Sequence, residues 1–190
     1  MKFGYMLFAQ YMPEEPLAER MRELAEQARA ARESGFDMVF TGEHRLAAPY
    51  QVASTVPCLA RVAAEVEGLE VGALCLLLPL HNPVELAEQI ATLDAISGGR
   101  LVLGGALGYR DEEYAAFRVN PRERVGRLLE CLHVMKMLWN GGEVSYEGRY
   151  YTVPSTVSTA LTTQKPHPPI WMGGDSDGAV RRAGRLGLPW

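Results

Sequence analysis

Cysteine is scarce in this sequence, with three residues, Cys58, Cys75 and Cys131, among 190. They are odd in number, far apart and embedded in apolar patterns, which argues against a disulfide framework or a cysteine-rich metal site. We therefore expect three reduced thiols in the core and no bound metal.

Basic residues are not in excess, because 19 Lys and Arg stand against 23 Asp and Glu, for a formal net charge of -4. That balance offers no basic surface to nucleic acid or to an anionic membrane. Long hydrophobic runs are also absent, and the longest, Ala73–Pro79, is far shorter than the roughly 20 residues that span a bilayer. The chain opens on an apolar strand pattern and shows no signal sequence. We expect a cytoplasmic protein that binds neither nucleic acid nor membrane.

The chain does have the composition of one ordinary globular domain, since 47% of its residues are hydrophobic and 22% are charged. Runs of apolar residues alternate with segments whose apolar residues recur at helical spacing. Five strand-helix units predict a parallel sheet, either open and doubly wound or closed as a barrel, and periodicity does not choose between them. Strands are expected at residues 2–8, 36–44, 69–80, 100–109 and 168–174.

The pattern of residues 69–109 predicts a strand, a helix and a second strand, joined by very short connections. Its first strand is apolar without a break, so both faces of that strand are expected to be covered. Asn82 can cap the helix, Pro83 fits its first turn, and Glu85 can reach back to the cap. The helix should end at Gly98-Gly99, where glycine permits a left-handed stop.

The second half of the chain adds a hairpin to this alternation. A polar loop is expected after Tyr109, followed by a helix that Asn120 caps and that carries Val125 on its buried side. Residues 143–153 alternate like an exposed β-hairpin. The polar run 155–165 then reads as a loop.

The segment LPLHNPVELAEQIATLDAISGGRLVLGGALGY, residues 78–109, carries a specific pattern. A strand ends in Leu-Pro, a histidine and Asn-Pro follow, and Leu-Asp, Ser-Gly-Gly-Arg and a glycine-rich strand end come in fixed register. The pattern resembles the central block of the luciferase-like flavin monooxygenases, the family of the bacterial luciferase subunits and of alkane and alkanesulfonate monooxygenases. The likeness covers essentially the whole chain.

This resemblance implies an α/β fold of the (β/α)8 TIM-barrel type. A full barrel takes about 250 residues, so residues 1–190 are expected to form a single barrel domain that is C-terminally incomplete, with the first five strand-helix units. We expect a fragment or a short paralogue. The edges of the first and fifth strands would then be unpaired, which predicts an aggregation-prone chain or a homo-oligomer such as a dimer.

His44 follows the second expected strand, whose carboxyl end would face the active site of a barrel. Taken alone, it could be a loop or capping histidine. Its place in a Glu-His pair resembles the catalytic histidine position of the family, which implies proton transfer near neutral pH. Glu43 is either a buried partner that orients the loop or a simple cap, and we favour the structural role. His81 either lines the pocket or holds its own turn. His133 and His167 are interpreted as packing or surface residues.

The turn Gly173, Gly174, Asp175, Ser176 leads from the fifth strand directly into a helix. Free N–H groups and the helix dipole at such a point favour a phosphate, and similar turns bind the flavin phosphate in the family. The alternative is a tight turn with Ser176 as a helix cap. Asp175 would have to point away from the phosphate. Leu107 occupies the position of an arginine in members of the family.

Three more residues are expected beside the flavin ring. The family carries a non-prolyl cis peptide on its third strand, and the equivalent bond here joins Leu74 and Cys75. Ala106 stands where bacterial luciferase has a reactive cysteine, so the resemblance does not imply light emission. No G-x-G-x-x-G motif follows a strand, which argues against a nicotinamide site. Reduced flavin would then come from a separate reductase.

The resemblance implies a flavin-dependent monooxygenase that uses reduced FMN and O2 to oxidise a small organic substrate in a pocket sheltered from water. One alternative is an oxidoreductase of the same fold that uses the deazaflavin coenzyme for hydride transfer. Another is a non-catalytic, truncated paralogue that binds flavin. The residues do not identify the substrate.

Overall fold

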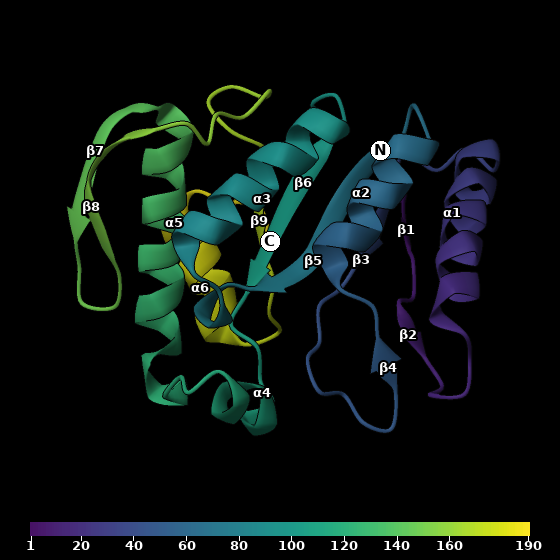
Figure 1. Ribbon diagram of the computed structural model, residues 1–190, viewed down its shortest axis with the longest axis horizontal. Helices are drawn as coiled ribbons and strands as arrows, with labels where there is room; N and C mark the ends of the chain where they lie inside the picture. Colours follow the sequence, from purple (N-terminus) through teal and green to yellow (C-terminus); the bar gives the residue numbers. More distant parts are fainter.

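Five parallel strands form the main sheet of the protein, which we describe from a computed structural model of residues 1–190 (Figure 1). Each strand lies beside the next sheet strand along the chain, and the order never reverses. A doubly wound sheet needs such a reversal, so the order is that of a barrel and the predicted α/β fold of TIM-barrel type is confirmed. The strands, in spatial order, are β1 (Gly4–Met6), β3 (Met38–Thr41), β5 (Glu70–Leu77), β6 (Leu101–Ala106) and β9 (Ile170–Met172).

The helices form a layer outside this sheet. Four of them stand side by side in Figure 1, and contacts pass from α1 to α2, from α2 to α3 and from α3 to α5. Right-handed crossovers after successive strands place successive helices on the same face of a sheet. The helices are α1 (Leu17–Glu33), α2 (Thr55–Glu65), α3 (Pro83–Ile96) and α5 (Arg124–Asn140), with α6 (Asp177–Leu186) after β9.

The main core lies between the helical layer and the sheet. It contains 37 buried residues, among them Val39 and Leu103. The other face of the strands carries a much smaller buried cluster of Met38, Phe40 and Val102. Neighbouring residues of a strand point to opposite faces, which explains why adjacent residues belong to different clusters. Much of the inner face is therefore available to line a cavity.

Helix α3 begins as the sequence predicts. The Asn82 side chain accepts hydrogen bonds from the N–H groups of Val84 at 2.9 Å and Glu85 at 3.4 Å. Pro83 occupies the first turn. The Glu85 carboxylate does not reach back to the cap and instead accepts a hydrogen bond from Gln89 at 3.1 Å. Residues four apart on a helix face each other, so this neighbour is the nearer partner.

Two expectations about the strands are wrong. β5 is not covered on both faces, since Leu74 and Cys75 are only half-buried. Its pairing with β6 shifts register between Ala73 and Leu76, which turns this part of the strand toward the inner face. β1 is shorter than the predicted residues 2–8 and is exposed, because it is an edge strand with one neighbour.

The segment after Tyr109, predicted as a polar loop, contains helix α4 (Asp111–Ala116) and a 3-10 turn, η2 (Pro121–Glu123). The acidic residues that suggested a loop lie in the first turn of α4, where the helix dipole favours negative charge. Val125, predicted on the buried side of α5, is 39% exposed, because α5 turns the face that carries Leu128 toward the core.

Two short antiparallel sheets complete the fold. β7 (Gly142–Glu147) and β8 (Thr152–Ser158) form the predicted hairpin, although β8 extends into residues predicted as a loop. β2 (Gln10–Tyr11) pairs with β4 (Gln51–Val52), and strands this short leave no alternating pattern in a sequence. A 3-10 turn, η1 (Leu78–Leu80), follows β5. None of the helices is both long and apolar enough to cross a membrane.

Candidate active site

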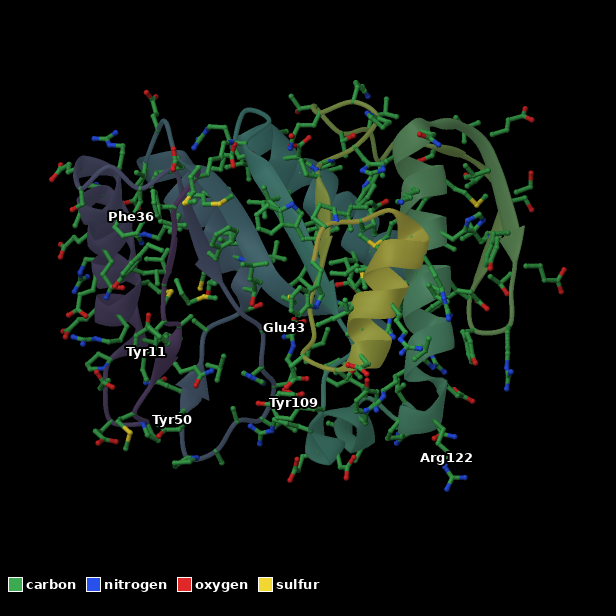
Figure 2. The ribbon with its side chains drawn as sticks, turned by 180° about the vertical axis from the view of Figure 1, so that it is seen from behind. Tyr11, Phe36, Glu43, Tyr50, Tyr109 and Arg122 are labelled. Carbon is green, nitrogen blue, oxygen red and sulfur yellow. The ribbon has the colours of Figure 1, made fainter.

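A cavity of about 700 Å³ opens at the carboxyl ends of the sheet strands. Figure 2 shows two of its lining residues, Glu43 and Tyr109, toward one end of the sheet and Phe36 toward the other. All eight site residues predicted from the sequence line this one cavity, although they come from four different strand ends. They are His44, Leu74, Cys75, Ala106, Gly173, Gly174, Asp175 and Ser176.

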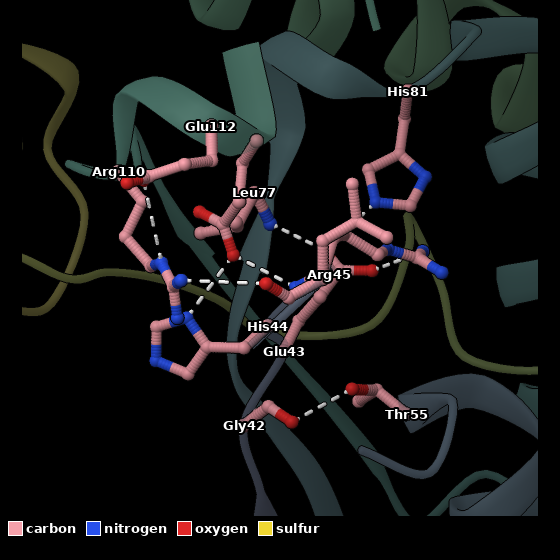
Figure 3. A network of polar contacts seen from close by, with 11 residues as sticks. Gly42, Glu43, His44, Arg45, Thr55, Leu77, His81, Arg110 and Glu112 are labelled. Carbon is pink, nitrogen blue, oxygen red and sulfur yellow. Dashed lines mark hydrogen bonds and ion pairs between the residues drawn. The ribbon is translucent and has the colours of Figure 1, made fainter. Parts of the chain in front are cut away.

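The imidazole of His44 lies on the segment after β3, and its contacts are drawn in Figure 3. Its Nδ1 is 3.1 Å from Oε1 of Glu113, a fully buried residue of α4. The same Oε1 accepts a 2.8 Å hydrogen bond from the Arg45 N–H, whereas Oε2 has no partner. The ring of Tyr109 meets the His44 ring edge-on, with 5.8 Å between the ring centres. His44 Nδ1 is thus engaged, and Nε2 makes no hydrogen bond within the protein.

Glu43 binds a different set of groups (Figure 3). Its buried carboxylate accepts hydrogen bonds from the Leu77 N–H at 2.7 Å and from His81 Nε2 at 2.9 Å, and it is ion-paired with Arg45. Burial works to raise the pKa of Glu43, but the bonds from His81 and Leu77 and the charge of Arg45 outweigh it and leave the pKa below its ordinary value. The prediction that Glu43 is a buried partner is confirmed, and it holds the turn that carries His81.

One wall of the cavity is close-packed and uncharged. The Leu74–Cys75 peptide bond there is cis, as predicted. Gly173 lies so close to Cys75 that a Cβ on Gly173 would be 2.3 Å from the Cys75 Sγ. Burial raises the pKa of the Cys75 thiol to about 11, so the thiol is protonated at neutral pH. With Ala106 beside it, this wall suits a flat, apolar ring.

Near α6 the cavity is lined by a helix cap and by two positively charged side chains. Ser176 caps the helix, with Oγ accepting a 3.3 Å hydrogen bond from the Ala179 N–H. Arg124 and Arg182 also line the cavity. The Arg182 Nε is buried without a hydrogen-bond partner, and burial, followed by the charge of Arg124, lowers the pKa of Arg182. An anion at this point would give Nε an acceptor and offset the two positive charges.

These two arginines and Glu113 were not predicted as site residues from the sequence. Arg124 and Arg182 supply the positive charge that Leu107 does not provide at the arginine position of the family. The available signal was the Arg181-Arg182 pair in the helix that follows the glycine turn. Nothing local singles out Arg124 or Glu113, because each lies in a segment rich in charged residues and its partner belongs to a different element.

The other two histidines lie away from the cavity. His133 of α5 packs against the ring of Tyr146, with 5.3 Å between the ring centres. His167 Nδ1 is 2.8 Å from the carbonyl oxygen of Pro168 and donates a hydrogen bond to it. Neither lines the candidate site, in agreement with their interpretation as packing residues.

A family model described as luciferase-like monooxygenase matches residues 1–190. The chain belongs to this family. The resemblance seen in the central block of the sequence is therefore confirmed, and the strand order and the cavity at the strand ends agree with it.

Two relatives show the range of chemistry in the luciferase-like family. An F420-dependent glucose-6-phosphate dehydrogenase of Nakamurella multipartita is 31% identical in an alignment that covers 97% of this chain and 54% of that protein. The oxygenase component of the flavin-dependent trigonelline monooxygenase of Acinetobacter baylyi is 31% identical over 154 residues, 79% of this chain and 42% of that protein. The chain spans about half the length of the curated relatives it matches.

Solved structures of the family have the same fold. Monooxygenase RslO1 from Streptomyces bottropensis superimposes with a TM-score of 0.88 at 29% identity, over 99% of this chain and 58% of that one. The oxygenating constituent of 3,6-diketocamphane monooxygenase from Pseudomonas putida, solved in complex with FMN, gives 0.88 at 21% identity, over 99% and 56%. The second likeness concerns the fold alone.

Proposed function

We propose that this chain forms the cofactor-binding part of a flavin-dependent monooxygenase that uses reduced FMN and O2 to oxidise a small organic substrate. One observation carries the proposal: a single cavity of about 700 Å³ is lined both by the imidazole of His44 and by Arg124 and Arg182 beside the start of α6. FMN has a phosphate at one end and a redox-active ring at the other, so one ligand can engage both. The volume lies in the usual range for small-molecule sites, about 300 to 1,000 Å³.

The residues of the cavity fit FMN at both ends. A phosphate oxygen would supply the acceptor that the buried Nε of Arg182 lacks, and Arg124 would share its charge. The uncharged wall of Leu74, Cys75 and Ala106 would lie against the ring. The close approach of Gly173 to Cys75 leaves no room for a side chain on that glycine.

When bound, reduced FMN would supply the electrons that activate oxygen. The residues of the chain bind, orient and shield. Arg124 and Arg182 hold the phosphate, while Phe8 and Tyr109, which line the cavity, keep water from the ring. His44 accepts or donates a proton at Nε2, the imidazole nitrogen that makes no hydrogen bond within the protein.

A separate reductase is inferred as a partner from the missing dinucleotide-binding motif and from one relative. Without a dinucleotide-binding motif, the flavin is reduced elsewhere, and we infer a separate flavin reductase, as the name of the trigonelline monooxygenase oxygenase component suggests for that protein. The three cysteines are unpaired, which suits the reducing cytoplasm. The substrate is a small organic molecule of unspecified class.

The substitution Arg182→Gln tests the anion site. It removes a positive charge and a charge-assisted hydrogen bond, so FMN should bind about ten- to a hundredfold more weakly. Arg181→Gln is the matched control, because Arg181 is exposed and does not line the cavity. Titration with FMN, followed by the change in flavin fluorescence, gives the three dissociation constants. Equal affinity of wild type and Arg182→Gln would contradict the proposed site.

A deazaflavin-dependent oxidoreductase is the second candidate, since the relative from Nakamurella multipartita that matches 97% of the chain is F420-dependent. Both coenzymes carry a phosphate, so the arginine variant does not separate them. Parallel titrations with FMN and with the deazaflavin do, together with oxygen uptake on adding reduced FMN and substrate. Oxygen uptake above that of free reduced FMN, with formation of an oxygenated product, supports the monooxygenase, and hydride transfer from the substrate to the deazaflavin supports the alternative. Flavin binding with neither activity would identify a non-catalytic paralogue.

A further inference from the structure

We infer that Glu113 is a positioning residue for His44, which holds the imidazole proton on Nδ1 and leaves Nε2 as the unprotonated nitrogen in the cavity. The inference rests on the proposed role of His44 and adds a second residue to it. Glu113 does not line the cavity and belongs to α4, the helix that replaces a predicted loop. Its effect on the reaction is exerted through the imidazole alone.

The Arg45 N–H shows which group donates in the hydrogen bond between His44 and Glu113. Oε1 of Glu113 lies 2.8 Å from the Arg45 backbone nitrogen and 3.1 Å from His44 Nδ1. A backbone N–H can only donate, so Oε1 already acts as an acceptor toward Arg45. The same oxygen is best satisfied as an acceptor toward Nδ1 as well. The imidazole proton therefore lies on Nδ1, and the neutral ring presents a lone pair at Nε2.

The burial of Glu113 points to the same role. The residue is fully buried, and its Oε2 has no hydrogen-bond partner. A buried carboxylate with an unsatisfied oxygen lowers stability rather than raising it. His44 is the one side chain to which Glu113 is hydrogen-bonded. Glu113 thus lowers stability and contacts one imidazole in a candidate active site. This combination fits a role in orienting His44 better than a structural role.

Glu43, the residue before His44, is an example of a structural carboxylate in this fold. Glu43 has partners on both oxygens, from Leu77 and His81 on one and from Arg45 on the other. Arg45 connects the two carboxylates, since its side chain pairs with Glu43 and its N–H donates to Glu113. These contacts fix the backbone at Arg45, the residue after His44. They therefore restrict the orientation of the imidazole as well as its tautomer.

The first test measures the tautomer of His44 directly in the purified protein without cofactor. Nitrogen-15 NMR of labelled histidine, assigned by comparison with His44→Ala, distinguishes protonated Nδ1 from protonated Nε2. We expect Nδ1–H in the wild type at a pH where the ring is neutral. A wild-type ring protonated on Nε2 would overturn the inference, and this result needs no variant at Glu113.

The second test uses Glu113→Gln, with Glu112→Gln as the matched control. Glu112 is the adjacent residue of α4, with a side chain that is 70% exposed. Losing a charged acceptor should shift the ratio of the two tautomers about tenfold or more toward Nε2–H. Turnover should fall about ten- to a hundredfold, with little change in the FMN dissociation constant. Glu112→Gln should leave all three quantities unchanged.

A double variant separates positioning from general damage. If Glu113 acts through His44, adding Glu113→Gln to His44→Ala lowers turnover no further. An unchanged tautomer in Glu113→Gln, or additive losses of turnover in the double variant, would contradict the inference. A protein with no monooxygenase activity would refute the proposed function instead, while the NMR measurement would still decide whether Glu113 sets the tautomer.

Discussion

Two buried carboxylates, Glu43 and Glu113, bind side chains and backbone of residues 43–45, and they have different roles. Glu43 is fully hydrogen-bonded and pairs with Arg45 and His81, so it contributes to stability. Glu113 leaves one oxygen without a partner and contacts the imidazole.

The contribution of Glu43 to stability should depend on pH. Its folded pKa lies below the ordinary value of about 4.3, so the contribution is fully present above that value and is lost as pH falls through the folded pKa. Glu43→Gln should therefore lower the free energy of unfolding by about 1 to 3 kcal/mol at pH 7 and by progressively less below about pH 4. Urea unfolding between pH 3 and pH 7 measures this difference.

The exposed residue Glu26 provides the control for this series, because no ion pair or hydrogen bond involves its side chain. Glu26→Gln should change the free energy of unfolding by less than about 0.5 kcal/mol at every pH. A Glu43→Gln deficit that stays the same from pH 7 to pH 3 would show that the charge of Glu43 is not what stabilises the fold.

At the scale of elements, the close approach of β5 to β6 depends on a glycine. A Cβ on Gly104 would be 2.3 Å from the backbone oxygen of Ala73, which cannot rotate away as a side chain can. This contact lies where the register of the two strands shifts. Glycine at position 104 is therefore required by the backbone of the neighbouring strand.

Gly104→Ala should destabilise the protein by about 1 to 3 kcal/mol or more, because the strands must separate to admit a methyl group. Gly184→Ala is the matched control, since Gly184 lies in α6 with nothing within 4 Å of the added Cβ. That change should be neutral or stabilising by up to about 1 kcal/mol. Chemical denaturation followed by tryptophan fluorescence compares the two. Equal stability of wild type and Gly104→Ala would refute the steric argument.

Local signals predicted most elements and their ends. Asn82 and Asn120 cap their helical segments as expected, because a cap depends on residues two or three positions away. The β2–β4 pair and the short helix α4 were beyond prediction. Two-residue strands carry no pattern, and α4 is marginal by itself and is fixed by the burial of Glu113 and Tyr114.

At the scale of the whole molecule, the edge of β1 is unpaired and apolar. Phe3 and Tyr5 are 58% and 37% exposed along it. The other edge is partly covered, since the Met172 N–H donates to the Pro189 oxygen at 2.8 Å, a contact the sequence did not reveal. An exposed strand edge beside apolar side chains promotes association.

We therefore predict that the 190-residue chain associates in solution through β1. Size-exclusion chromatography with light scattering should give a mass at least that of a dimer, and Tyr5→Lys should shift the distribution toward the monomer. Val157→Lys is the control, because Val157 is 63% exposed on the distant hairpin strand β8. A monomeric wild type at all accessible concentrations would contradict association through this edge.

The sequence by itself determined the order of strands and helices, the caps, and the position of His44 and the Gly173–Ser176 turn at strand ends. Each of these depends on periodicity or on neighbours a few residues away. Only the tertiary structure decided which side chains meet. Glu113 of α4 contacts His44, which follows β3, and Arg124 of α5 lines the same cavity as Arg182 of α6. Such contacts depend on how distant elements pack, and no local pattern encodes them.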